Sequence, residues 1–185
     1  MRRDLTDMSF LGDGYVICIC EGASEEAIMD LLLNGNQLVF KRNSLVGRKI
    51  TRRRKASEIE SLYLQQDYTK AVRIVRVLDS KAELFELSPL YKERFPVYDI
   101  YTCPEIEMLL VYAEERDAVY RRKYKTKMKP SEYCSTELFP GKNVKSKSFL
   151  EEYFSDTKKL VQSIKAYHQK RSSSKQLDLS SLLHV

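Results

Sequence analysis

The feature that most constrains the fold is a short apolar segment that runs directly into Glu-Gly and then into a helical pattern. Residues 14–20 (GYVICIC) are almost continuously apolar and include β-branched and aromatic side chains. This composition is typical of a strand that is buried on both faces. Glu21 and Gly22 end the run, and residues 23–34 then have apolar side chains at helical spacing, with Ser24 as a candidate N-cap. The sequence therefore predicts a strand, a tight turn and a helix.

The rest of the chain continues this alternation of strands and helices. A second strand is expected at residues 37–41, which would complete a βαβ unit, and further strands are expected at residues 70–78 and 96–103. Helical segments are expected at residues 56–66, 81–87, 104–115, 116–127 and 149–170, the last in two pieces joined near Ser155 and Asp156. Residues 130–141 are interpreted as a loop. This order predicts an α/β fold with a mostly parallel sheet flanked by helices.

Length and composition favour a folded domain with extensions at both ends. The chain has 185 residues, of which 43% are hydrophobic and 31% are charged, and this is ordinary globular usage that argues against wholesale disorder. We expect a lead-in at residues 1–13, an α/β domain at residues 14–145, a helical C-terminal extension at residues 146–170 and a polar tail at residues 171–185.

The sequence favours a cytoplasmic protein with no membrane association. No apolar run approaches the roughly 20 residues that a membrane-spanning helix needs, and the first ten residues lack the apolar stretch of a signal peptide. Cys18, Cys20, Cys103 and Cys134 do not have the paired spacing of a zinc site, so we expect four free thiols.

Carboxylates follow three of the predicted strands at their carboxyl ends. They are Glu21 and Glu25 after the first strand, Asp79 and Glu83 after the strand at 70–78, and Glu105 and Glu107 after the strand at 96–103. The carboxyl ends of parallel strands meet at one edge of a sheet, and oxygen ligands gathered there suit a hard cation such as Mg²⁺ or Mn²⁺. Glu25 and Glu105 have an alternative explanation, because the helix dipole favours acidic residues in a first helical turn. Glu21, placed between a buried strand and a glycine, is the strongest candidate.

The first of these segments, residues 15–25 (YVICICEGASE), resembles the first motif of the Toprim domain, which topoisomerases, primases, RecR recombination mediators and OLD-type nucleases share. Its EGASE form is most similar to the OLD and RloB branches. Residues 77–81 (VLDSK) and 102–110 (TCPEIEMLL) resemble, in the same order, the later RloB motifs: a strand that ends in Asp, and an Asn-Pro-x-Phe-Glu-type segment that opens an apolar helix.

The resemblance implies a Toprim-like fold with an acidic site that binds Mg²⁺ or Mn²⁺. Carried over to this chain, it implies that Glu21, Asp79 and Glu107 are metal ligands and that Glu25 is a fourth. It also implies that Glu21, Asp79 and Lys81 are the catalytic residues of a phosphoryl-transfer reaction on DNA or RNA.

Two positions depart from the family pattern. Lys81 stands where most Toprim proteins have a second Asp, so either Glu83 substitutes for it, Lys81 contacts a phosphate, or the metal site is incomplete. Ala113 stands where the RloB pattern has His. Both departures bear on catalysis more than on fold.

Among Toprim activities, the resemblance favours a nuclease, since topoisomerases and primases need further domains. The resemblance implies an RloB-like, metal-dependent nuclease of bacterial anti-phage defence that works with a partner ATPase. The alternative is a catalytically silent Toprim-fold subunit that regulates or binds an ATPase complex. A third interpretation is a protein that binds nucleic acid only through its basic surface. The sequence does not indicate which oligomeric state the protein has. It contains no P-loop motif for ATP binding.

Two basic clusters are candidates for contacts with a phosphate backbone. The formal net charge is +6, and phosphate contacts need positive charge without strict geometry. The candidate nucleic-acid-binding residues are Arg52, Arg53, Arg54, Arg121, Arg122, Lys123, Lys125 and Lys127. Tyr120, Tyr124 and Tyr133 lie near the second cluster and are candidates for stacking on bases. The alternative is that these charge runs are only solvated helix faces or loops.

Overall fold

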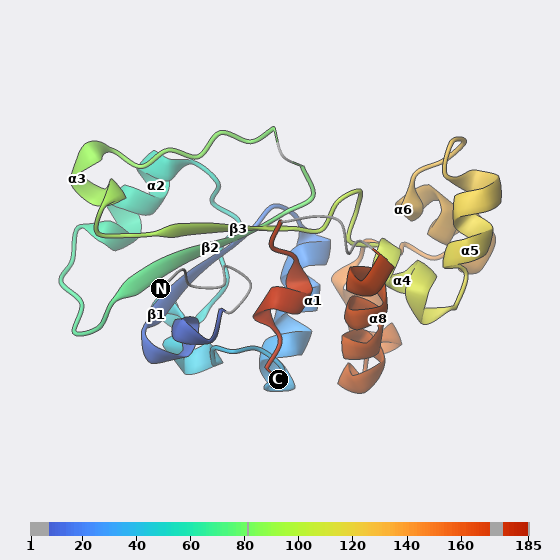
Figure 1. Cartoon of the computed structure of the whole chain (residues 1–185), viewed down its shortest axis with the longest axis horizontal. Coiled ribbons are helices and arrows are strands. Elements are labelled where there is room, and N and C mark those ends of the chain that lie inside the picture. The colour runs from blue at the N-terminus through green and yellow to red at the C-terminus, as the bar shows by residue number, and fades with distance from the viewer. Residues whose placement is uncertain (1–7, 81, 171–175, 185) are drawn as a thin grey trace.

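The computed structural model describes residues 8–80, 82–170 and 176–184. Its centre is a parallel sheet of three strands in the order β1 (Tyr15–Cys20), β2 (Val72–Leu78) and β3 (Val97–Tyr101) (Figure 1). Tyr15 is paired with Val72 in the first ladder, and Ile74 with Val97 in the second. The predicted α/β class and the three strands near these positions are confirmed.

Helices cover both faces of the sheet and continue beyond it. Their bounds are α1 (Ala23–Asn34), α2 (Ala56–Ile59), α3 (Pro89–Lys92), α4 (Met108–Ala113), α5 (Asp117–Val119), α6 (Pro130–Tyr133), α7 (Lys147–Tyr153) and α8 (Thr157–Lys170). Three of them continue as π-helical turns: η4 (Glu60–Leu64) after α2, η5 (Tyr120–Tyr124) after α5 and η6 (Cys134–Leu138) after α6. Short 3-10 turns are η1 (Ser9–Asp13), η2 (Arg42–Ser44), η3 (Val46–Arg48) and η7 (Leu179–Leu182). No helix among these described segments is long and apolar enough to span a bilayer.

Strand β1 is buried on both faces, as its unbroken apolar sequence predicts. Successive side chains of a strand point to opposite faces. Val16, Cys18 and Cys20 therefore join the larger core, which includes α1, while Ile17 and Ile19 join a smaller core that includes α2. The two thiols of the Cys-x-Cys pair share one face, and both are free and buried.

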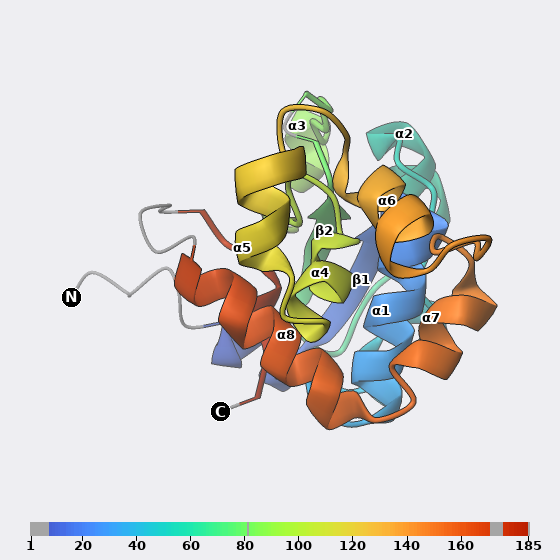
Figure 2. The ribbon, with the colours of Figure 1, turned by 90° about the vertical axis from the view of Figure 1, so that its right-hand side faces the viewer.

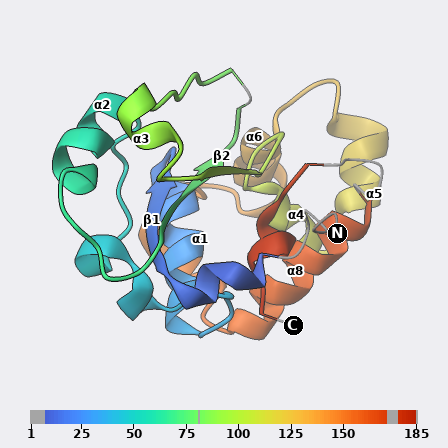
Figure 3. The same ribbon diagram turned by 60° about the vertical axis from the view of Figure 1, so that its left-hand side comes forward.

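The C-terminal helices gather on the side of the molecule toward which β3 runs. Figure 2 shows α4, α5, α7 and α8 on this side, with α7 packed on α1 and α8 packed on α4. The break between α7 and α8 falls at Ser155 and Asp156, as predicted. Beyond the helices, η7 packs beside α8 (Figure 3), and Leu179, Leu182 and Leu183 are buried in the larger core.

The strand predicted at residues 37–41 is wrong. Leu38 forms only an isolated antiparallel bridge with Leu183, and the N–H of Val39 donates to the carbonyl of Leu182 at 2.9 Å. The free edge of β1 is instead met by isolated bridges to Leu45 and Thr51. Residues 37–41 therefore pair with the end of the chain and not with the sheet.

Three predicted segments also differ from the structure. Residues 82–87 form no helix, and residue 81 lies outside the described residues. Pro104 does not open a helix, because residues 103–107 form turns and α4 begins only at Met108. The loop predicted at residues 130–141 is wrong for most of its length, since Pro130 is the first residue of α6, a position where the missing N–H of proline costs no hydrogen bond.

Candidate functional site

Glu21 and Asp79 lie side by side because they end neighbouring parallel strands. Glu21 Oε2 accepts a hydrogen bond from the backbone N–H of Asp79 at 3.0 Å. The N–H of Glu21 donates to the carbonyl of Val77 at 3.1 Å, which continues the β1–β2 ladder for one more residue. The carboxylate of Glu21 is thus fixed at the carboxyl edge of the sheet, facing the start of the segment that follows β2.

The first turn of α1 brings Glu25 to the same edge. A Cβ atom at Gly22 would lie only 2.8 Å from Glu25 Oε2, so the glycine leaves room for this carboxylate beside the turn. Glu25 is only 5% exposed. Burial is the main cause that raises the pKa of Glu25, and the negative charges of Glu107, Asp79 and Glu21 add to it. A backbone hydrogen bond lowers the pKa, and the combined result is a pKa of about 7.

The segment that precedes α4 brings Glu107 to this cluster. Glu107 is 3% exposed, and its Oε1 accepts a hydrogen bond from the hydroxyl of Ser24 at 2.9 Å. Burial raises the pKa of Glu107, while Lys145 and the Ser24 hydroxyl oppose that rise. Ser24 is the neighbour of Glu25, so the start of α1 and the start of α4 are tied together at the carboxylates. The four side chains predicted as metal ligands, Glu21, Glu25, Asp79 and Glu107, thus lie near the same edge of the sheet.

Glu105 is a further carboxylate of this site that was not among the predicted ligands. Burial is the main cause that raises the pKa of Asp79, a side-chain hydrogen bond with Glu21 adds to it, and the charges of Glu21 and Glu105 also contribute. Glu105 accepts a hydrogen bond from the N–H of Ser131 at 2.9 Å, and Lys145 Nζ lies 3.8 Å from its other oxygen. The sequence signal that could have identified Glu105 is its position two residues before Glu107, after the same strand.

Arginines separate Glu83 from the other carboxylates. Arg54 lies 3.2 Å from Glu21 and 3.5 Å from Glu83, so it bridges the two. Glu83 also lies 3.7 Å from Arg76, which is 2% exposed and pairs with Asp99 at 3.1 Å. In this conformation Glu83 pairs with two arginines.

The donor set fits a divalent ion in chemistry, although the oxygens are not arranged around one point. Among the residues that the structure describes, no group of three or more His, Cys, Asp or Glu side chains is placed so that it could hold a metal ion. The carboxylates instead hold protein donors: Glu21 the N–H of Asp79, and Glu107 the hydroxyl of Ser24. Lys81, the third predicted catalytic residue, lies outside the described residues.

The first basic cluster divides between the site and the surface. Arg54 faces the acidic site, whereas Arg52 pairs with Glu26 at 3.2 Å, and the side chain of Arg53 is exposed. Arg52 is also on the acidic side, because Glu26 follows Glu25 in α1. Two of the three arginines therefore pair with carboxylates in the structure, and all three remain exposed.

The second basic cluster is exposed on η5 and the turn after it. The exposed members are Arg121, Arg122, Lys123, Lys125 and Lys127. Arg121 pairs with Asp117 one turn earlier. Tyr124 and Tyr133 pack together with a centroid distance of 4.8 Å, and Tyr120 packs on Tyr133 at 5.1 Å. These three tyrosines form an aromatic group behind the basic residues, and Tyr120 and Tyr133 are buried.

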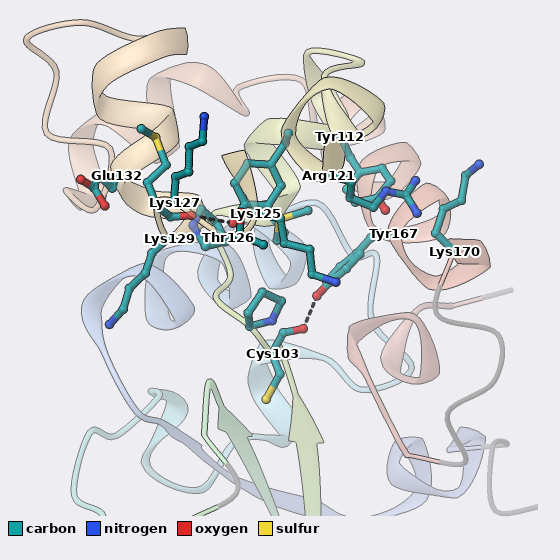
Figure 4. A pocket seen from close by; sticks show the side chains of 15 residues that line it. Cys103, Tyr112, Arg121, Lys125, Thr126, Lys127, Lys129, Glu132, Tyr167 and Lys170 are labelled. Atoms are coloured by element: carbon teal, nitrogen blue, oxygen red, sulfur yellow. Dashed lines mark hydrogen bonds between the residues drawn. The ribbon is translucent and has the colours of Figure 1, made fainter. Parts of the chain in front are cut away.

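A pocket of about 610 Å³ opens between this basic cluster and the last turns of α8 (Figure 4). Its lining residues are Cys103, Pro104, Met108, Tyr112, Tyr120, Arg121, Lys125, Thr126, Lys127, Met128, Lys129, Pro130, Glu132, Tyr167 and Lys170. The pocket shares a wall with the acidic site, because the thiol of Cys103 donates to the carbonyl of Asp79 at 2.8 Å. On the pocket side, the hydroxyl of Tyr167 donates to the carbonyl of Cys103.

Comparison with protein-family models, with curated proteins and with solved structures finds no match for this chain. The resemblance to Toprim proteins therefore rests on the three motifs of the sequence.

Proposed function

We propose that this chain is an RloB-like Toprim nuclease that hydrolyses phosphodiester bonds of DNA or RNA with Mg²⁺ or Mn²⁺. The observation that carries the proposal is the meeting of carboxylates from three separate segments at the carboxyl edge of the sheet. Glu21 contacts Asp79 there, and Ser24 ties Glu107 to the start of α1 beside Glu25. In an open parallel sheet, this edge is where ligands bind. The resemblance adds a role in bacterial anti-phage defence with a partner ATPase.

Glu21, Glu25, Asp79 and Glu107 would hold the ion. A bound divalent ion supplies polarisation of a phosphate and a lowered pKa for a water molecule. Glu25 holds a proton at neutral pH for part of the time, since its pKa is about 7. A cation binds the ionised carboxylate, so we expect binding to release this proton and to tighten as the pH rises.

In this proposal, two cations beside the carboxylates would hold a phosphate group. Arg54 lies at the rim with Glu21, and Lys145 lies near Glu105, and both side chains are about half exposed. When an ion neutralises the carboxylates, these cations lose part of their present attraction to them. They are then free to pair with phosphate oxygens, which strengthens substrate binding at the site.

The proposal is tested by incubating the protein with plasmid, single-stranded DNA and structured RNA, each with Mg²⁺ and with Mn²⁺. We expect cleavage by wild type and a loss of at least about a hundredfold in Asp79→Asn and Glu21→Gln, since each removes a charged oxygen from the site. Glu86→Gln is the matched control, because Glu86 is an exposed carboxylate paired with Lys92. Equal inactivity of wild type and Glu21→Ala with every metal, also with the partner ATPase present, would contradict the proposal.

A catalytically silent regulatory subunit of an ATPase complex is the second candidate. It is favoured by the lysine at position 81 and by the carboxylates of the described residues, which are engaged with protein donors and not grouped as ligands. It predicts that the chain binds its partner equally well with and without a chelator, and that Asp79→Asn keeps full biological function.

A further inference from the structure

The pocket beside the acidic site has an aromatic and apolar floor. The rings of Tyr112, on α4, and Tyr167, on α8, lie with centroids 5.2 Å apart and planes inclined by 36°. Pro104, Met108 and Met128 add apolar surface around them. Both tyrosines line the pocket and are only partly buried. Such a floor suits a flat aromatic group, which gains dispersion and stacking energy against it.

The rim of the pocket is strongly positive. Its charged members are Arg121, Lys125, Lys127, Lys129, Lys170 and one acid, Glu132. Figure 4 shows Arg121 and Lys170 on one side of the opening and Lys127 and Lys129 on the other, with Tyr167 and Cys103 between them. None of the four lysines forms an ion pair with a residue that the structure describes. Their charge is therefore available to an anion.

A flat apolar floor under a cationic rim matches the chemistry of a nucleotide. A free phosphate or a lipid headgroup would use the rim but would leave the tyrosines uncovered. The volume of about 610 Å³ is within the roughly 300–1,000 Å³ of pockets that hold small organic ligands, and it is far too small for a duplex. A base inside the pocket must therefore be unpaired.

The position of the pocket relates it to the carboxylates. Cys103 lines the pocket and contacts the backbone of Asp79, and Pro130 lines it directly before Ser131, whose N–H binds Glu105. A strand with one base in the pocket would therefore pass a neighbouring phosphate along the wall that the pocket shares with the acidic site.

We propose that this pocket binds one unpaired nucleotide, with the base on Tyr112 and Tyr167 and the adjoining phosphates on the lysines of the rim. Nucleotide binding by the pocket does not depend on nuclease activity. The further statement that the nuclease acts on single-stranded nucleic acid rests on the proposed function. Single-stranded segments bind in preference to duplexes, because a paired base must first be taken out of its stack.

The test measures binding without cleavage. Fluorescence anisotropy with labelled single-stranded DNA and RNA oligonucleotides, and with the matching duplexes, is done in EDTA with Asp79→Asn as the background protein. We expect single strands to bind at least about tenfold more tightly than duplexes. A 2-aminopurine base in the oligonucleotide reports stacking, since its fluorescence falls when it lies against an aromatic ring.

Two pairs of variants separate the base from the phosphates. Tyr112→Leu keeps apolar volume but removes the ring, and we expect roughly tenfold weaker binding and recovered 2-aminopurine fluorescence, while Tyr112→Trp restores both. Lys170→Gln weakens binding and its salt dependence, whereas Lys165→Gln, on the same helix outside the pocket, changes neither. Thermal melting of each variant checks that it is folded.

The outcomes for the pocket and for the nuclease are distinct. Equal binding of duplex and single strand, or an effect of Lys170→Gln without any effect of Tyr112→Leu, overturns the nucleotide pocket and leaves only a basic surface. Metal-dependent cleavage by wild type that Tyr112→Leu does not slow overturns the pocket while keeping the nuclease. Tight single-strand binding that depends on Tyr112, in a protein that never cleaves, overturns the nuclease while keeping the pocket.

Discussion

Single residues set the electrostatics of the acidic site, and Glu25 is the most affected. A carboxylate in water has a pKa near 4.3, whereas burial and the nearby Glu107, Asp79 and Glu21 raise the pKa of Glu25 to about 7. The folded protein therefore binds a proton at Glu25 at pH values where the unfolded chain has already released it. Glu25 thus makes the fold less stable as the pH rises from about 4.5 to 7.

Glu25→Gln is expected to remove this pH dependence. The amide keeps the shape of the side chain but carries no charge, so the variant should be more stable than wild type at pH 8 by about 1–3 kcal/mol and nearly equal to it at pH 4.5. Urea unfolding in EDTA at both pH values measures the difference. Glu86→Gln, at an exposed carboxylate, should follow wild type. A difference between wild type and Glu25→Gln that is the same at both pH values would contradict the assignment of the raised pKa to Glu25.

The hydrogen bond from Ser24 to Glu107 is a second contact at this scale. The donor and the acceptor are both buried, and the Ser24 hydroxyl, Lys145 and a backbone hydrogen bond all favour the ionised form of Glu107. Ser24→Ala should lower the free energy of unfolding by about 1–3 kcal/mol at pH 8, because the buried carboxylate of Glu107 loses its hydrogen-bond donor. The loss should shrink when the pH falls and Glu107 takes up a proton. Ser61→Ala, at an exposed hydroxyl, is the control for urea unfolding.

At the scale of elements, the final segment of the chain completes the larger core. Leu182 is fully buried, and Leu183 forms the bridge with Leu38. Leu182→Ala should therefore destabilise the protein by about 2–4 kcal/mol, since it removes buried methyl groups and leaves a cavity. Leu90→Ala, at a leucine that is 68% exposed, should change stability by less than about 0.5 kcal/mol in the same urea titration. Equal effects of the two substitutions would show that the segment does not pack as described.

The elements that the sequence predicted well are those whose pattern is local. Strand β1 is recognisable because six successive apolar residues leave few alternatives to a doubly buried strand. Residues 37–41 also have an apolar centre, but their partner is the distant segment around Leu183, which no local pattern reveals. The helix at Pro130 was missed because proline and polar residues are as common in loops as in a first helical turn.

In the candidate site, too, only the part that follows from local patterns could be predicted from the sequence. Glu21, Asp79 and Glu107 could be placed together because the ends of parallel strands share an edge. The contacts that Arg54 makes with Glu21 and Glu83, and the pocket between η5 and α8, depend on how segments far apart in the sequence pack. Neither is encoded in the spacing of residues along the chain.

At the scale of the whole molecule, the acidic site joins β1, α1, β2 and the start of α4. A ligand that binds this site in the folded state, and not in the unfolded chain, must stabilise all of these elements together. A divalent cation also offsets the repulsion among the carboxylates, which otherwise weakens the fold. We therefore expect Mg²⁺ or Mn²⁺ to raise the melting temperature of wild type, with a larger effect at pH 8 than at pH 6.

A thermal-shift titration with each metal measures this effect, and the variants show where it arises. At a metal concentration 100 times the dissociation constant, the stabilisation is about 2.7 kcal/mol, which corresponds to a shift of several degrees for a chain of this size. Asp79→Asn should reduce the shift, because it removes one charged oxygen, while Glu86→Gln should keep it. NaCl at equal ionic strength separates site binding from general screening of charge. A shift that NaCl reproduces, or that Asp79→Asn keeps in full, would place the cation elsewhere on the protein, and the carboxylates from the three segments would then be only a buried acidic cluster.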